Sequence, residues 1–230
     1  MKRFIKKLFG IKSKSTKQFY GQIFNDVPVD QFLYERYFKN IKHGFFIECG
    51  AADGLNLSCC KFFEESMHWK GINIEASPAK FAKLLINRPK SFLNLNKGLY
   101  NVSGEYVFRD DNVEDPTKAH GWGNGSFNHT EKHVNNLSAI GVQLQESQVT
   151  TITFKELIDE HNITCVDLFI LDVEGVEPMV IEGMKDSKVL PTHVFIEHEH
   201  FGLDKCIELM AELGYRCDWN DHCNSMYIKK

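Results

Sequence analysis

The sequence contains no internal repeat, no low-complexity tract and no G-x-G-x-x-G loop. The absence of that loop disfavours a dehydrogenase-type site, because its glycines let the backbone approach a pyrophosphate. The seven cysteines include no pair of C-x-x-C motifs, which excludes the usual zinc-binding pattern of cysteines. We therefore expect reduced, mostly buried thiols in a cytoplasmic protein.

Acidic residues are missing from residues 1–17, which carry seven of the 27 Lys and Arg residues. The remaining 20 basic residues face 31 acidic ones, so the rest of the chain does not favour a nucleic-acid partner. This basic N-terminal arm also lacks the continuous apolar core of a signal peptide or a membrane span. Two interpretations stay open: a solvated terminus, or a peripheral contact with the inner face of a membrane.

Short apolar runs alternate with helix-like segments along residues 18–230, which is typical of one α/β domain with a parallel sheet. Strands are predicted at Phe45–Cys49, Gly71–Ala76, Ser91–Leu95, Val166–Leu171 and Thr192–Ile196, with a terminal antiparallel pair at Tyr215–Trp219 and Ser225–Lys229. Helices are predicted at Val29–Lys42 and Leu55–Met67, from Pro78, after the capping-box spacing Thr153–Glu156, around Pro178, and up to Gly214.

The segment 109–148, after a short extra strand at Glu105–Phe108, is polar and reads as irregular. A loop of that length inside a compact domain is unusual unless it is functional or disordered. Its centre combines glycines with Trp122 and Phe127, which favours a lid that packs over a ligand. A floppy loop is the alternative.

The turn Glu48-Cys-Gly-Ala-Ala-Asp-Gly54 follows an apolar strand, and Glu75 ends the next one. Glycines in such a turn let a ligand approach the main chain, and an acid at the second strand end can accept hydrogen bonds from ribose hydroxyls. Glu48 and Asp53 would repel a pyrophosphate but suit the positive groups of S-adenosylmethionine. The alternative interpretation is a tight turn with solvated acids.

Two later strands also end in titratable residues, Asp172-Val-Glu174 and Glu197-His-Glu-His200. Because the carboxyl ends of parallel strands meet at one edge of the sheet, these groups are candidates for a functional site. Each of these residues also has an interpretation that involves no function. Glu174 or Glu177 could cap the following helix, and His198 could be a core histidine, while we expect Glu199 and His200 to be solvated.

Three motifs together, Phe46–Gly54, Trp69–Glu75 and Leu171–Pro178, resemble the FkbM family of S-adenosylmethionine-dependent methyltransferases. The resemblance spans about residues 44–215 and includes Glu182-Gly183 and the Gly-Trp-Gly-Asn loop, although Cys49 and Ala52 depart from the residues common in the family. It implies a Rossmann-like seven-stranded class I methyltransferase sheet with helices on both faces. It also implies methyl transfer, usually to a hydroxyl of a sugar or natural product.

On this resemblance, the cofactor would be S-adenosyl-L-methionine, and its acceptor a small molecule or saccharide. The expected cofactor-binding residues are Glu48, Gly50, Ala51, Asp53, Gly54, Ser58, Glu75, Ala76 and Asp172. Asp172 and His198 are the expected catalytic residues, with His198 as general base and Asp172 as the alternative base.

No residue is assigned as a metal ligand, although Asp172, Glu174 and Glu197 are oxygen donors suited to Mg²⁺. Two other functions stay open: an oxidoreductase-like nucleotide-binding Rossmann protein, and a non-catalytic binding module.

Overall fold

The computed structural model describes residues 17–24, 26–111, 113–114 and 121–230. The basic arm lies outside the described residues except for Lys17, so its membrane contact stays a prediction. Within the described ranges, no helix is both long and apolar enough to cross a membrane.

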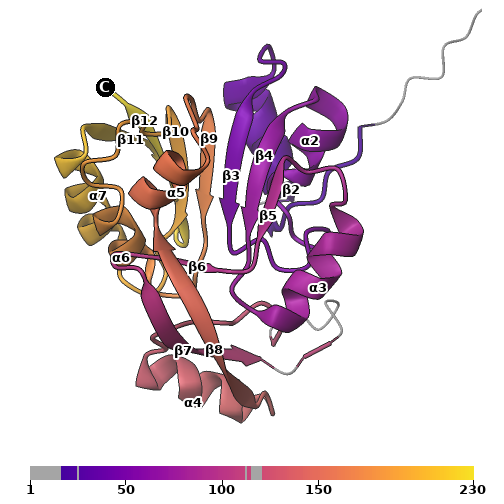
Figure 1. Ribbon diagram of the computed structural model, residues 1–230, viewed down its shortest axis with the longest axis vertical. Helices are drawn as coiled ribbons and strands as arrows, with labels where there is room; N and C mark the ends of the chain where they lie inside the picture. Colours follow the sequence, from indigo (N-terminus) through magenta and orange to yellow (C-terminus); the bar gives the residue numbers. More distant parts are fainter. Residues whose placement is uncertain (1–16, 25, 112, 115–120) are drawn as a thin grey trace, which may run out of the picture.

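Seven strands form the main sheet in the order β11-β12-β10-β9-β3-β4-β5 (Figure 1). They are β3 (Phe45–Cys49), β4 (Lys70–Ile74), β5 (Leu93–Leu95), β9 (Leu168–Leu171), β10 (His193–Glu197), β11 (Tyr215–Asn220) and β12 (Asn224–Lys229). All neighbouring pairs from β10 to β5 are parallel, whereas β12 is antiparallel to β10 and β11. The order reverses between β3 and β9, and the predicted Rossmann-like seven-stranded fold is confirmed.

Both faces of this sheet are buried because successive apolar side chains of a strand point to opposite sides. Phe46 packs with one core and Ile47 with the other. The first core is covered by α1 (Val29–Leu33), the π-helix η2 (Tyr34–Phe38) and α2 (Lys61–Met67). The second is covered by α5 (Phe154–Glu160), α6 (Glu177–Glu182) and α7 (Leu203–Glu212).

Two predicted helices are shorter in the structure. The helix predicted at Val29–Lys42 is α1 followed by η2 and ends at Phe38. The helix predicted from Leu55 begins at Lys61. Asp53 accepts hydrogen bonds from the N–H groups of residues 55 and 56, and Glu48 accepts them from residues 59 and 60, which holds this segment in turns.

The described residues within 109–148 do not form the irregular loop that the composition of this segment predicts. The strand β7 (Gly104–Asp111) runs antiparallel to β8 (Leu144–Thr153), and α4 (Glu131–Ala139) lies between them in the chain. With β6 (Gly98–Tyr100) they make a second sheet, which lies beyond the carboxyl ends of the parallel strands (Figure 1). This pairing joins residues far apart in the sequence, so local composition could not indicate it. The separate pair β1 (Ile23–Phe24) and β2 (Val27–Pro28) precedes α1.

The cysteines are all free, as the spacing predicts. Only three of them are buried, Cys49, Cys60 and Cys206. The expectation of mostly buried thiols was therefore wrong, because the other four lie in turns, loops and an edge strand that solvent reaches.

A buried arginine joins four separate segments beneath the first turn. Arg88 follows α3 (Pro78–Asn87) and is 1% exposed. Its guanidinium bonds Glu64 of α2 and lies 3.1 Å from Ser58 Oγ, 3.3 Å from the Gly54 carbonyl oxygen and 3.5 Å from the Glu48 carboxylate. Glu48 also accepts hydrogen bonds from the Cys59 and Cys60 N–H groups. Arg88 therefore ties α3 to β3, to the turn and to α2.

We expect Arg88→Met to destabilise the protein by about 3–5 kcal/mol, because it leaves the buried Glu48 carboxylate without its cation. Urea denaturation measures the loss. The matched control is Arg36→Met, whose side chain is 45% exposed in its ion pair with Asp218. That change should cost at most about 1 kcal/mol. Equal losses in the two variants would contradict a special role for Arg88.

Candidate active site

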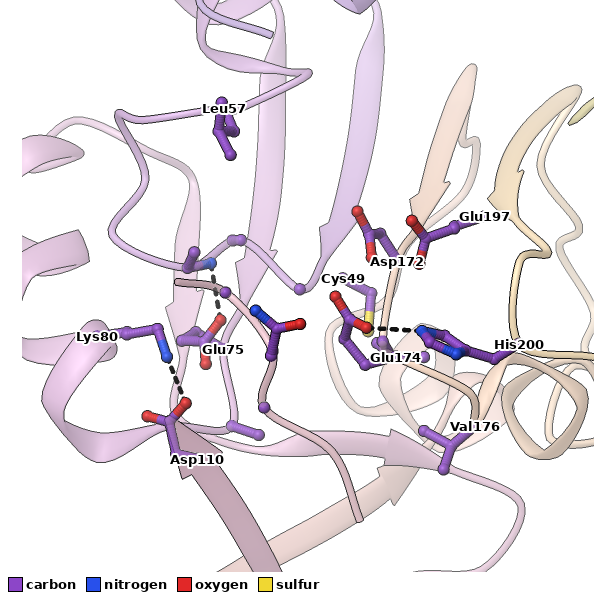
Figure 2. Close-up of a pocket in the computed structure, with 18 of the residues that line it drawn as sticks. Cys49, Leu57, Glu75, Lys80, Asp110, Asp172, Glu174, Val176, Glu197 and His200 are labelled. Carbon is purple, nitrogen blue, oxygen red and sulfur yellow. Dashed lines mark hydrogen bonds and ion pairs between the residues drawn. The ribbon is translucent and has the colours of Figure 1, made fainter. Parts of the chain in front are cut away.

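A cavity of about 960 Å³ lies at the carboxyl ends of the parallel strands. Its walls come from the turn after β3, the ends of β4, β9 and β10, and the chain between β7 and α4 (Figure 2). It therefore lies at the reversal of strand order, where open α/β sheets bind their ligands.

The turn after β3 needs glycine at its start. Gly50 has a φ of +83°, and a side chain there would collide with the carbonyl oxygen of Asp172. The N–H groups of Gly50 and Ala51 both donate to the Ile74 carbonyl oxygen, at 3.1 and 3.0 Å. These contacts hold the turn against the ends of β4 and β9, with Gly50 and Ala51 in the cavity wall.

Glu75 stands at the end of β4 and lines the cavity together with Ala76. Its two carboxylate oxygens accept hydrogen bonds from the Ala52 and Ser77 N–H groups, each at 2.7 Å. Burial raises the pKa of Glu75 to about 7, and the nearby Lys80 charge opposes that shift. Each carboxylate oxygen has more than one lone pair, so Glu75 can still accept hydrogen bonds from a ligand.

Three expected cofactor contacts are absent from the cavity wall: Glu48, Asp53 and Gly54. Glu48 is turned into the Arg88 network, and Asp53 accepts hydrogen bonds from the Leu55 and Asn56 N–H groups. Both acids therefore stabilise the turn from the side that faces away from the cavity. Their buried carboxylates bind the nearest cation or free backbone N–H groups there. Ser58, which donates to Glu48, does line the cavity.

Asp172 and Glu197 lie side by side at the ends of β9 and β10 and line the cavity (Figure 2). Burial and the Glu174 charge raise the pKa of Asp172 to about 7, and burial with the Asp172 charge raises that of Glu197 well above its usual range. Glu177 lies behind them and accepts hydrogen bonds from the Val173 and Gly175 N–H groups. Burial raises its pKa to about 8. The raised pKa values of Asp172 and Glu177 lie close to neutral pH, and Asp172 is the most solvent-exposed of the three acids.

The structure separates the acids that the sequence grouped as possible magnesium ligands. Oxygen atoms of Asp172, Glu177 and Glu197 lie within 4.8 Å of one another. Glu174 instead accepts a hydrogen bond from His200 Nε2 at 2.8 Å. Glu177, which we considered only as a helix cap, does not cap α6 with its side chain; it binds N–H groups of the preceding loop and completes this group of acids.

The structure does not bring His198, the expected general base, to the cavity. His198 is buried at 3% exposure and is absent from the cavity wall, whereas Glu197, Glu199 and His200 line it. His200 is also not the solvated residue that we expected, because it is half-buried against Glu174. Glu199 is exposed, in line with its interpretation as solvated.

The far side of the cavity is built by the loop of Trp122 and by three charged residues that the sequence did not single out, Lys80, Asp110 and Asp111. Lys80 of α3 forms ion pairs with Asp110 and Asp111 at the end of β7. Asp111 in turn accepts hydrogen bonds from the Gly123 and Asn124 N–H groups, both at 3.0 Å. Trp122 is thereby held in the wall, although lid closure stays a prediction. Only the folded chain brings these residues together.

Among solved structures, a methyltransferase FkbM from Methylobacillus flagellatus KT has a TM-score of 0.50 and 11% identity, covering 84% of this chain and 46% of that one. This chain thus spans less than half the length of that protein. A methyltransferase from Pyrococcus furiosus has 12% identity and a TM-score of 0.43, with 99% and 93% of the two chains covered. M. capricolum TrmK in complex with S-adenosyl-homocysteine has 9% identity and a TM-score of 0.38, with 83% and 63% covered.

Of these three, only the Methylobacillus structure reaches a TM-score of 0.50, and at its identity it shows the fold alone. No curated protein matches the chain. The model of the methyltransferase FkbM domain, however, matches residues 48–217, which is most of the sequence. This chain therefore belongs to the FkbM methyltransferase family.

Proposed function

We propose that the protein transfers a methyl group from S-adenosylmethionine to a hydroxyl of a saccharide or related small molecule. The observation that carries the proposal is Glu75, a buried carboxylate at the end of β4 that faces the cavity beside the glycine turn. An acid in that place suits the two ribose hydroxyls of an adenosine. The family supports methyl transfer as the reaction.

The residues in the wall fit such a cofactor. Glu75 would hold its ribose, and the backbone of Gly50 and Ala51, which forms part of the cavity wall, would lie along it. Ser58 and Asp172 would face its amino acid end. When bound, S-adenosylmethionine supplies a methyl group on a sulfonium. The sulfur is a good leaving group, so the transfer needs no acid to protonate it.

The chain must then place the acceptor oxygen and remove its proton. We assign the base to Asp172, because its carboxylate lies in the cavity wall and its pKa of about 7 suits proton transfer near neutral pH. Glu197 lies beside it and would share the proton. The wall also offers Asn124, Lys132 and Asn136, polar side chains that can bind the several hydroxyls of a saccharide.

Two measurements test the proposal with the full chain. Titration calorimetry with S-adenosylhomocysteine and with NAD distinguishes a methyltransferase site from an oxidoreductase-like one. Transfer of labelled methyl groups to a panel of saccharides and glycoconjugates then identifies the acceptor class. Binding of NAD without S-adenosylhomocysteine would overturn the proposal, and methylation of only non-carbohydrate acceptors would overturn its substrate class.

We expect Glu75→Gln to weaken S-adenosylhomocysteine binding by at least about tenfold, because each hydrogen bond to the charged carboxylate contributes roughly 1.5–3 kcal/mol. Glutamine keeps one of the two oxygens that accept the Ala52 and Ser77 N–H groups, so circular dichroism must first establish that the variant is folded. Glu105→Gln, at an exposed residue of β7, is the matched control. Calorimetry on both variants gives the comparison. Unchanged affinity in Glu75→Gln would remove Glu75 from the site.

The same residue predicts a pH dependence. Since its pKa is raised to about 7, Glu75 becomes increasingly ionised as pH rises through 7, and the ionised form accepts the stronger hydrogen bonds. Affinity should therefore increase about tenfold from pH 6 to pH 8 in the wild type. The slope should flatten in Glu75→Gln. A slope that persists in this variant would point to Asp172 or Glu197 instead.

Asp172→Asn should lower kcat about 10²–10⁴-fold with the acceptor found in the screen, because the amide cannot take the proton. His198→Gln should stay close to the wild type, since His198 does not line the cavity. Steady-state kinetics on both variants decides between the two bases. A loss confined to His198→Gln would reverse the assignment. Removal of metal with EDTA, followed by addition of Mg²⁺, tests the magnesium alternative on the wild type.

A further inference from the structure

Two histidines and a glutamate meet at the side of the cavity beside α4. His133 belongs to α4, Glu174 follows β9, and His200 follows β10. One donor atom from each lies within 4.8 Å of the other two. All three residues line the cavity. Three segments that are distant in the sequence thus present imidazole nitrogen and carboxylate oxygen to one point.

The hydrogen bonding of His133 leaves one ring nitrogen available. Its Nε2 lies 3.1 Å from the side-chain oxygen of Asn124, which can only accept, so Nε2 carries the proton. Its Nδ1 is then a lone pair, and it is buried without a hydrogen-bond partner among the described residues. His133 as a whole is 8% exposed. A buried imidazole oriented by a carbonyl on its other nitrogen is how proteins present histidine to a metal ion.

The neighbouring groups support this arrangement. The His133 and His200 rings stack with centroids 4.6 Å apart and planes 12° from parallel, which disfavours a positive charge on both. Glu174 accepts a hydrogen bond from His200 Nε2 at 2.8 Å and places a negative charge in the cluster, and an ion bound at this nitrogen would replace its proton. A cation would be stabilised by that carboxylate and by the neutral imidazole.

We propose that His133, Glu174 and His200 bind a divalent transition metal ion of the Zn²⁺ class. Mixed imidazole and carboxylate donors favour such ions over Mg²⁺, which prefers oxygen alone. Donor atoms around a tetrahedral zinc ion lie roughly 3.3–3.5 Å apart, given bonds of about 2.0–2.2 Å, so the side chains must close in slightly. The loops that carry Glu174 and His200 allow this more easily than the ends of a strand would.

The ion would join α4 to the ends of β9 and β10 and so fasten that wall of the cavity. Three protein ligands would leave a fourth position on a tetrahedral ion, and all three ligands line the cavity. The proposal does not rest on methyl transfer, because it concerns metal binding by the protein alone.

The test is titration of the full, EDTA-treated chain with Zn²⁺ by calorimetry, together with the visible absorption of bound Co²⁺. The wild type should bind one ion with the spectrum of four-coordinate cobalt. His133→Ala and His200→Ala should each weaken Zn²⁺ binding by at least about tenfold. His161→Gln, at the end of α5 and outside the cluster, is the matched control and should bind as the wild type does.

Circular dichroism establishes that each variant is folded, and His133→Asn replaces His133→Ala if the alanine variant is not. No binding by the wild type would overturn the proposal. Wild-type affinity in both histidine variants would do the same. Loss of Zn²⁺ binding in Asp172→Asn but not in the histidine variants would place the ion in the acid group instead and also overturn it. Calorimetry with S-adenosylhomocysteine on the metal-free protein separates these results from any failure of the proposed function.

Discussion

The buried ion pair between Glu48 and Arg88 is the constraint on which the first half of the site depends. Glu48 belongs to β3, yet its carboxylate points behind the glycine turn, where it binds Arg88, Ser58 and the N–H groups at the start of α2. Arg88 passes so close to Gly54 that a side chain there would contact it. These contacts hold the turn in one backbone conformation, and that conformation places Ser58 in the cavity wall.

The two ends of the cavity are coupled through main-chain contact. Gly50 lies against the Asp172 carbonyl oxygen, so the turn after β3 and the end of β9 cannot separate without opening a void. Glu75 lies on one side of this contact and the Asp172–Glu197 pair on the other. A ligand that spans the strand-order reversal would have Glu75, which can bind hydroxyl groups, at one end. At its other end it would have the Asp172–Glu197 pair, which can accept a proton. That division suits a reaction between two bound molecules.

The opposite wall is organised by a chain of polar contacts that begins in α3. Lys80 holds Asp111, Asp111 holds the backbone of Asn124, and the Asn124 side chain orients His133. Each of these contacts uses a buried or half-buried group, so the loss of one contact would change the geometry of the next. The proposed metal ion would close this chain onto the ends of β9 and β10.

Local sequence determined the central strands, because Phe45–Cys49 and Leu168–Leu171 are apolar enough to be buried on both faces. It also determined the capping box at Thr153–Glu156 and the position of Glu75 at a strand end. Only the tertiary structure decided which acids face the cavity, since Glu48 is turned away by a distant arginine. It likewise decided between His198 and His200, because both follow the end of β10, where the alternation of strand faces no longer sets side-chain direction.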